Sequence, residues 1–480
     1  MDILANFIDG QYQAPLAQQY LDNIEPATGK VYGQLPDSCQ QDLALAVTAA
    51  EKALPAWQSM ALEQRADYLL AIANEINNRL DELAIAEAID NGKPVTLART
   101  VDIPRAASNF KFFAHACTQF ASEAHAMVGS AINYTLRPAI GIVGCISPWN
   151  LPLYLFTWKI APALAAGNCV IAKPSEVTPK TAAILGEICQ KVGLPNGVLN
   201  ILHGRGTNIG QAICQHKKIT AISFTGGTTT GAVIAQLVAP SFKKLSLELG
   251  GKNPALIFAD CDFEDTLEQV FRASFANQGQ ICLCASRLYI ERSIYHKFKQ
   301  ALVAKARALS PSDPLHDDCE MGAMVSKTHL DKVLGHLDDA KAQGAKILIG
   351  GQQVQLTGRC QQGYFLQPTI MENLPNSARA NQEEIFGPVI TIQPFDNDQQ
   401  ALALANDSQY GLAATIWTNN LTRAHQLAEH INTGIVWINC WLLRDLRTPF
   451  GGMKHSGLGR EGGLDAMRFF TESKNVCVKY

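Results

Sequence analysis

Between residues 139 and 239, short runs of aliphatic and β-branched residues alternate with stretches whose apolar residues recur at helical spacing. The runs lie at 139–147, 169–175, 198–204 and 221–227, and the helical patterns at 157–166, 180–192, 209–217 and 230–239. Such strand–helix alternation predicts a parallel sheet with helices on both faces. The chain is therefore expected to fold as an α/β protein.

A second series of strand-like runs follows residue 248. The runs lie at 253–258, 287–291, 346–351, 389–395, 413–418 and 434–439, with helical patterns near 263–275, 293–308, 326–343 and 421–431. Because 480 residues exceed what one hydrophobic core usually serves, we predict a second α/β domain. The residues before about 135 are predicted to be mostly helical, at 41–56 and 62–90, with Asn91-Gly92-Lys93-Pro94 ending the second helix.

Two strand-like segments, 132–137 and 473–480, stand apart from both series. Isolated strands that are distant in the sequence are candidates for a sheet formed between subunits. We expect a homo-oligomer, and the sequence leaves a homodimer and a homotetramer equally open.

The composition is that of a well-buried globular protein, with 47% hydrophobic and 17% charged residues. A formal net charge of −3 gives no electrostatic reason to expect nucleic acid or a membrane as a partner. The N-terminus lacks a basic segment followed by an apolar one, and no apolar run reaches the roughly 18 residues that span a bilayer. We therefore expect a soluble, cytoplasmic protein.

The 13 cysteines are scattered and odd in number, and the only close pair is Cys282 and Cys284. A disulfide framework or a structural zinc site would need tighter, paired spacing, so no metal site is expected. Most of these cysteines are predicted to be small buried hydrophobic residues. Cys282 is the exception.

Three turns between strands and helices are suited to binding a dinucleotide. The segment Gly204–Gly210 follows a strand and opens a helix, but its G-x-G-x-x-x-G spacing is one residue longer than the usual fingerprint. The turn Phe224–Gly227 precedes a helix whose first backbone N–H groups are free to bind a pyrophosphate. In Lys173–Glu176, the Glu176 carboxylate can bind ribose hydroxyls of NAD and would repel an NADP 2′-phosphate. Each turn alone could be a plain loop, but three together favour a cofactor.

A polar, glycine-containing turn, Phe275–Cys282, delivers a cysteine just after a predicted helix end. A nucleophilic cysteine needs access and an easily removed proton, which such a turn can provide. A buried structural cysteine would suit an apolar run better. The turn by itself leaves both interpretations open.

Five motifs then occur in one order along nearly the whole chain: PWNLP at 148–152, LELGGKNP at 247–254, NQGQICLC at 277–284, EEIFGP at 383–388 and PFGGMKHSG at 449–457. Together they resemble the aldehyde dehydrogenase superfamily. The resemblance implies a Rossmann-type NAD-binding domain at 1–118 and 138–249 and an α/β catalytic domain at 250–455. It also implies a small β oligomerisation element at 119–137 and 456–480.

The resemblance assigns three catalytic roles. Cys282 would attack the aldehyde to give a thiohemiacetal and then a thioester. The Asn150 side-chain amide and the Cys282 backbone N–H would bind the oxyanion. Glu248 would activate the water that hydrolyses the thioester. An exposed strand-end carboxylate is the alternative for Glu248, and its place in LELGG disfavours that alternative.

The resemblance also implies which residues contact NAD. These are Ile146, Ser147, Pro148, Trp149, Lys159, Lys173, Ser175, Glu176, Gly206, Gly210, Phe224, Thr225, Gly226, Gly227, Leu249, Glu384 and Phe386, with Lys159 expected near the nicotinamide carboxamide. Two positions depart from the family. Gly227 stands where many relatives have Ser, and Leu151 stands where Phe is commoner, so the substrate tunnel is expected to be wider there.

The segments 102–105 and 439–447 resemble the branch that oxidises 2-aminomuconate and 2-hydroxymuconate 6-semialdehydes. These substrates carry a carboxylate remote from the aldehyde, and arginine binds carboxylates through a planar fork. We therefore predict that Arg105 and Arg444 clamp the substrate, with Arg447 a weaker candidate. Structural arginines in ordinary ion pairs are the alternative, and the sequence does not separate the amino from the hydroxy substrate.

Two rival functions remain at this stage. Betaine aldehyde, retinal or a simple aliphatic aldehyde could be the substrate, although a cationic substrate would call for aromatic or acidic groups at the tunnel mouth, where Arg444 is expected. A non-catalytic dinucleotide-binding protein could share the fold. Such a protein would be expected to lack Cys282 or Glu248, and both are present.

Overall fold

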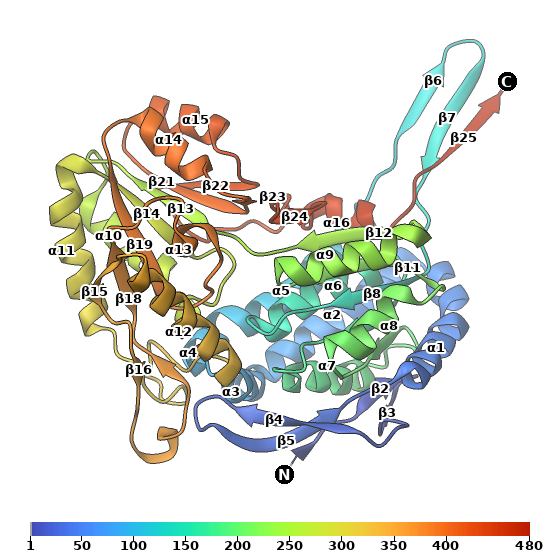
Figure 1. The fold of residues 1–480 in the computed structure, drawn as a ribbon. Coiled ribbons are helices and arrows are strands. Elements are labelled where there is room, and N and C mark those ends of the chain that lie inside the picture. Colours follow the sequence, from blue (N-terminus) through green and yellow to red (C-terminus); the bar gives the residue numbers. More distant parts are fainter. Residues whose placement is uncertain (1) are drawn as a thin grey trace.

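Two large sheets, each covered by helices, form two lobes in the computed structural model, which describes residues 2–480 (Figure 1). The first sheet has eight strands in the order β24-β12-β11-β8-β9-β10-β2-β3. The second has seven strands in the order β15-β18-β19-β14-β13-β21-β22. The α/β class and the two series of strands predicted from the sequence are thus confirmed.

The first sheet has a parallel centre made of β8 (Ile142–Ile146), β9 (Cys169–Lys173), β10 (Leu199–Ile201), β11 (Ile219–Thr225) and β12 (Lys244–Glu248). Its antiparallel edges are β24 (Gly457–Leu458) on one side and β2 (Asn6–Ile8) and β3 (Gln11–Gln13) on the other. The helices of this lobe include α1 (Gln40–Ser59), α6 (Pro152–Ala165), α7 (Lys180–Lys191), the π-helical turn η2 (Gly206–Gly210), α8 (Gln211–Gln215) and α9 (Thr228–Val238). Strand order reverses between β8 and β11, which is where such sheets open a crevice for a ligand.

The N-terminal region is less helical than its sequence suggests. The predicted helix at 62–90 is two helices, α2 (Leu62–Asn78) and α3 (Leu80–Asn91), separated at Arg79. Five short strands lie in residues 2–36: β2 and β3, together with β1 (Asp2–Ile3), β4 (Tyr20–Glu25) and β5 (Lys30–Pro36). These strands carry many exposed or half-buried residues, so they lack the apolar runs that reveal a buried strand. The helical region continues through α4 (Val95–Leu97), the π-helical turn η1 (Ala98–Asp102) and α5 (Ile103–Thr118).

The second sheet is parallel except for one edge. Its strands are β13 (Asn253–Ile257), β14 (Ala285–Glu291), β18 (Thr369–Glu372), β19 (Val389–Phe395), β21 (Ala413–Trp417), β22 (Ile435–Ile438) and the antiparallel edge strand β15 (Lys346–Ile349). Its helices are α10 (Phe263–Phe275), α11 (Arg292–Ala308), α12 (Lys327–Ala342), α13 (Arg379–Gln382), α14 (Asp398–Asn406) and α15 (Leu421–His430). Two separate two-stranded antiparallel sheets pair β16 (Gln353–Val354) with β17 (Phe365–Leu366) and β20 (Tyr410–Gly411) with β23 (Met453–Lys454).

A three-stranded arm projects from the first lobe (Figure 1). It consists of β6 (Ala124–Met127), β7 (Ala131–Leu136) and the C-terminal strand β25 (Lys474–Lys479). The two strands predicted to be isolated, β7 and β25, therefore pair with each other in the same chain. Of the segment 456–480, only its end joins the arm, because β24 pairs with β12 and α16 (Gly463–Phe469) packs against α6.

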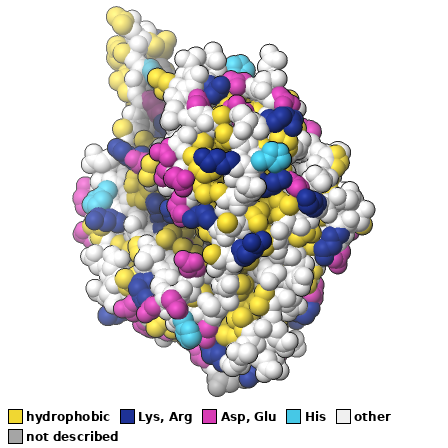
Figure 2. All heavy atoms as spheres, turned by 90° about the vertical axis from the view of Figure 1, so that its left-hand side faces the viewer, with side chains coloured by type: hydrophobic (Ala, Val, Ile, Leu, Met, Phe, Trp, Pro, Cys, Tyr) yellow, Lys and Arg dark blue, Asp and Glu magenta, His cyan; other side chains and the backbone are white. Residues whose placement is uncertain are grey.

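The arm is also where apolar side chains remain uncovered. Figure 2 shows acidic and basic side chains interspersed over one face of the molecule, whereas the projecting arm is largely hydrophobic. The exposed large hydrophobic residues of the arm include Met127, Val128, Ile132, Tyr134, Leu136 and Val478. Among residues 2–480, no helix combines the length and apolarity needed to cross a membrane.

Candidate active site

Cys282 follows a strained turn at the end of α10. Asn277 and Gln278 have φ values of 51° and 56°, and Gly279 follows with φ 69°. A Cβ added at Gly279 would lie 2.1 Å from the carbonyl oxygen of Gly387, so only glycine fits there. Left-handed backbone at residues other than glycine stores strain that the surrounding structure must hold, and it clusters at functional sites. This turn therefore fixes the position of Cys282 and the direction of its side chain.

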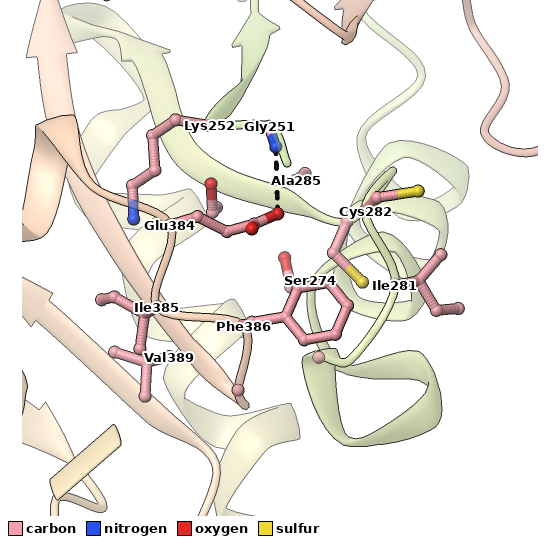
Figure 3. A pocket seen from close by; sticks show the side chains of 14 residues that line it. Gly251, Lys252, Ser274, Ile281, Cys282, Ala285, Glu384, Ile385, Phe386 and Val389 are labelled. Atoms are coloured by element: carbon pink, nitrogen blue, oxygen red, sulfur yellow. Dashed lines mark hydrogen bonds between the residues drawn. The ribbon is translucent and has the colours of Figure 1, made fainter. Parts of the chain in front are cut away.

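The Cys282 thiol lies where several cavities meet. It lines an inner cavity of about 750 Å³ on one side and a cofactor-side cavity of about 650 Å³ on the other. A smaller cavity, which Cys282 shares with Glu384 and Phe386, is shown in Figure 3. Burial raises the pKa of the Cys282 thiol, and the carboxyl groups of Glu384 and Glu248 raise it further. The free protein therefore stores this cysteine as a thiol that must lose its proton before it can act as a nucleophile.

Asn150 is placed against the cysteine turn by both its side chain and its backbone. The Asn150 amide Nδ2 donates to the carbonyl of Gln280 at 2.9 Å, which leaves its second N–H free to bind a ligand. The Asn150 carbonyl accepts from Asn277 Nδ2 at 3.1 Å and from Lys93 Nζ at 3.1 Å. The Cys282 backbone N–H donates to no acceptor within residues 2–480. Two free donors are thus available for an oxyanion next to the thiol.

Lys93 is buried, and it carries the charge that holds the Asn150 loop. Its ammonium pairs with Glu87 Oε1 at 3.2 Å and with Asp102. Although burial opposes the charged form, Asp102 and Glu87 raise the pKa of Lys93, so the ammonium persists. From the sequence this lysine was noted only as part of a helix-ending motif, because nothing local places it beside Asn150.

Glu248 is the last residue of β12, and it lines the inner cavity together with Cys282. Burial raises its pKa well above the usual range and Glu461 adds to this, whereas Lys159 and Arg444 act in the opposite direction. Its Oε1 has no hydrogen-bond partner among the described residues. A carboxyl group with these surroundings keeps its proton to a higher pH than an exposed glutamate does, and it can exchange that proton with a water molecule in the cavity.

Lys159 lies in a buried ion pair, and its expected place near the nicotinamide carboxamide stays a prediction. Its Nζ donates to Glu461 Oε1 at 2.7 Å and to Ser223 Oγ at 3.1 Å. Lys159 does not line the groove that runs over the first sheet. A buried ammonium with a carboxylate partner is a satisfied pair, so the structure gives Lys159 a supporting position behind Glu248. No motif in the sequence identifies Glu461 as a residue of this site.

A groove of about 1150 Å³ runs over the reversal point of the first sheet, and its walls fit a dinucleotide. The buried hydroxyls of Ser147 and Thr225 border it and have no partner among residues 2–480. The N-terminus of α9 opens onto it after Gly227, where an added Cβ would meet nothing within 4 Å. Free hydroxyls, free helix N–H groups and this space suit a pyrophosphate.

Glu176 is held at one end of the groove. Its Oε2 accepts from Lys173 Nζ at 2.9 Å, and its Oε1 accepts from the Gly206 N–H at 3.2 Å. Although burial opposes the charge, Lys173 and these hydrogen bonds lower the pKa of Glu176 below its usual value. The carboxylate therefore stays ionised, in the state that binds a pair of ribose hydroxyls.

The groove continues into the cofactor-side cavity. Both are lined by the same five residues, namely Pro148, Trp149, Thr225, Gly226 and Gly227. Trp149 packs edge-on against Phe386, with ring centroids 5.2 Å apart. Glu384 Oε1 accepts from the Gly251 N–H at 2.9 Å (Figure 3).

The structure thus brings nearly all of the predicted cofactor residues to one continuous surface that ends at Cys282. The groove is lined by Ile146, Ser147, Pro148, Trp149, Lys173, Ser175, Glu176, Gly206, Gly210, Phe224, Thr225, Gly226 and Gly227, and the cofactor-side cavity adds Leu249, Glu384 and Phe386. Lys159 alone stands outside it. Cys284 is buried and free, and within residues 2–480 no group of three or more His, Cys, Asp or Glu side chains could hold a metal ion.

On the side of Cys282 away from the groove, the inner cavity adjoins a larger outer cavity, and five residues line both. The Arg444 guanidinium lies 3.9 Å from the Phe450 ring centroid and donates to Tyr154 Oη at 2.8 Å. Arg105 lies 5.9 Å from the centroid of the same Tyr154 ring and lines the outer cavity only. Arg447 is exposed and paired with Asp445, whereas no carboxylate of residues 2–480 is paired with Arg105 or Arg444.

The comparisons with known proteins agree on one family. A family model described as "Aldehyde dehydrogenase family" matches residues 13–476. The 2-aminomuconic semialdehyde dehydrogenase of Mus musculus is 47% identical over 100% of this chain and 98% of the mouse protein. The 2-hydroxymuconic semialdehyde dehydrogenase of Pseudomonas sp. (strain CF600) is 44% identical over 100% of both chains. The solved NAD+ complex of a Bacillus cereus aldehyde dehydrogenase has a TM-score of 0.97 at 35% identity, covering 100% of this chain and 97% of that one.

Proposed function

The chain belongs to the aldehyde dehydrogenase family, and we propose that it oxidises 2-aminomuconate 6-semialdehyde to 2-aminomuconate. As a member of this family it is an NAD-dependent oxidoreductase that converts an aldehyde to a carboxylate. The observation that carries the choice of substrate is the pair of arginines, Arg105 and Arg444, which have no carboxylate partner among residues 2–480 and border the outer cavity. Relatives named for this substrate share up to 47% of the sequence.

The first step belongs to Cys282 and Asn150. The Cys282 sulfur, once deprotonated, attacks the aldehyde carbon, so a C–S bond forms and the C=O π electrons move to oxygen. The resulting oxyanion would be stabilised by the second Asn150 N–H and by the Cys282 backbone N–H, and the absence of other acceptors for these groups among residues 2–480 supports this role. NAD, when bound in the groove, would supply the acceptor for the hydride that leaves the aldehyde carbon, and Cys282 would then carry the acyl group as a thioester.

The second step belongs to Glu248. Its carboxylate takes a proton from a water molecule in the inner cavity while the water oxygen attacks the thioester carbon. The C–S bond then breaks, and the electron pair returns to the Cys282 sulfur. NAD would be held by the groove residues, with Glu176 and Lys173 at the ribose of the adenosine and Glu384 and Phe386 at the nicotinamide ribose.

Steady-state kinetics of Arg105→Gln and Arg444→Gln test the choice of substrate. With a muconate semialdehyde, each variant should raise KM by about tenfold to a hundredfold, because each removes a charge-assisted contact. With hexanal, which lacks the carboxylate, KM should change little. Arg447→Gln is the matched control, since Arg447 is exposed and already paired with Asp445. Equal losses on both aldehydes would contradict the proposed clamp.

The hydroxy analogue is the second substrate that we consider. It presents the same carboxylate and aldehyde, and a relative named for it is 44% identical over the whole chain. Comparison of kcat/KM for the amino and hydroxy substrates with the same enzyme preparation decides between them. A cationic substrate such as betaine aldehyde is disfavoured, because an unpaired guanidinium at the tunnel would repel it.

We further propose that the arm joins copies of the chain into a homodimer or homotetramer in the cytoplasm. The exposed hydrophobic side chains of β6, β7 and β25 and the free edges of that sheet support the first point. The thirteen free cysteines support a reducing compartment. The proposed division of the chain keeps the arm, residues 119–137 with the C-terminal strand, as the oligomerisation element. Light scattering on the purified enzyme and on Ile132→Glu tests the assembly.

A further inference from the structure

A third arginine lies in the passage between the inner and the outer cavity. The residues that line both cavities are Val101, Tyr154, Arg272, Leu442 and Arg444. We call the two cavities together the tunnel, and these five residues its neck. Arg105 is not among them, because it lines only the outer cavity. The neck therefore carries two guanidinium groups, from Arg444 and from Arg272 in the last turn of α10.

Arg272 is free to bind an anion. It is exposed and takes part in no ion pair within residues 2–480, and the acid one turn before it, Glu268, is already paired with Lys305 at 2.6 Å. Its guanidinium carbon lies 5.7 Å from the centroid of the Trp441 ring. Stacking on an aromatic ring holds a guanidinium while leaving its N–H groups available to a ligand.

The aromatic ring under Arg272 is hydrogen-bonded to the segment that carries Cys282. Trp441 is buried, and its Nε1 donates to the carbonyl of Leu283, the residue after Cys282, at 2.9 Å. The position of the Arg272 guanidinium is therefore linked to the segment that carries the thiol. Such a link suits a group that must bind one end of a molecule while its other end meets Cys282.

We propose that Arg272 is a specificity-determining residue that binds the carboxylate end of the substrate at the neck, together with Arg444. This inference rests on the proposed function and extends it by a residue outside the two arginine motifs. A free carboxylate entering the outer cavity meets Arg105 first and then two unpaired cations at the neck. The tunnel thus favours ω-carboxylated aldehydes over neutral aldehydes of the same length through at least three positive charges.

Two aldehydes that differ only at the far end test this proposal. The full-length enzyme and Arg272→Gln are compared on 6-oxohexanoate and on hexanal with saturating NAD, at low and high salt. Arg272→Gln should lower kcat/KM for 6-oxohexanoate about tenfold and leave hexanal nearly unchanged. It should also weaken the salt dependence for the anionic substrate, because one steering charge is gone. Arg272→Lys should recover part of the loss.

The outcomes separate the two levels of the proposal. Arg307→Gln, which alters an exposed arginine on the neighbouring helix α11, is the matched control and should behave like the unaltered enzyme. If the unaltered enzyme does not prefer 6-oxohexanoate to hexanal, the proposed substrate class is wrong. If that preference exists and Arg272→Gln retains it in full, the role of Arg272 is wrong while the proposed function stands. Equal loss on both aldehydes would make Arg272 a structural residue.

Discussion

The proposed cofactor side and the proposed substrate side of Cys282 are lined by different kinds of residue. The groove is lined mostly by residues at the carboxyl ends of β8, β9 and β11, many of which are small, such as Ser147, Gly226 and Gly227. The inner cavity is walled by large side chains from distant segments, among them Leu155, Arg272, Trp441 and Phe450. Backbone turns can persist while side chains change, so the cofactor should stay fixed across relatives and the substrate should vary.

The largest expected effect comes from the residue at which the two sides meet. Cys282→Ala should lower aldehyde oxidation by at least about 10⁴-fold, because it removes the nucleophile. NAD binding, followed by quenching of protein fluorescence, should remain close to that of the unaltered enzyme. Cys284→Ala is the matched control and should keep most of the activity, since Cys284 is buried and free. Comparable activity in Cys282→Ala would show that the two sides do not meet at this thiol.

Glu248 should dominate the pH dependence on the substrate side. Burial raises the pKa of Glu248, so the carboxylate that accepts a proton becomes more abundant as pH rises through that raised value. We therefore expect kcat to rise with pH in a limb that lies above the usual titration range of a glutamate, because the carboxylate forms only as pH passes through the raised pKa. Glu248→Gln should lower kcat by about 10²- to 10⁴-fold and remove this limb of the profile. A profile with the same limb in the variant would assign the titration to another group.

A variant of Lys93 tests whether a residue outside both cavities positions Asn150, the proposed oxyanion donor. Lys93→Met leaves the Asn150 carbonyl with one donor fewer and leaves Asp102 and Glu87 without their cation. We expect kcat to fall about tenfold to a hundredfold with a small change in the KM for aldehyde, as when an oxyanion donor is misplaced. Thermal unfolding of the variant reports any loss of stability separately. A lower Tm with unchanged kcat would restrict Lys93 to a structural role.

The smallest effect is expected at the far end of the groove. Glu176→Gln should raise the KM for NAD a few-fold and improve the use of NADP, because the repulsion of a 2′-phosphate is lost. Glu187→Gln, at an exposed position on α7, is the control. Unchanged discrimination between NAD and NADP would remove Glu176 from the ribose site and weaken the contrast between a fixed cofactor side and a variable substrate side.

What could be predicted from the sequence follows the same division. Residues within short motifs, such as Asn150 in PWNLP and Glu384 in EEIFGP, were placed at the cofactor surface because a motif and its turn are local. Arg272 and Glu461 were missed because only the packing of distant segments brings them to the inner cavity. The ion pair of Lys159 could not be predicted for a related reason, since its partner Glu461 lies 302 residues away in the chain. The N-terminal strands could not be predicted because they are short and most of them are partly exposed, which leaves no distinct apolar pattern.

Direct detection of the acyl intermediate tests the central claim, that Cys282 joins the two sides of the site. Glu248→Gln is mixed with NAD and a muconate semialdehyde, quenched in acid, digested and analysed by mass spectrometry. The peptide that contains Cys282 should gain the mass of the acyl group, in step with one equivalent of NADH per active site, because hydrolysis of the thioester is slowed. NADH formation without an adduct, or an adduct on Cys284, would contradict the claim.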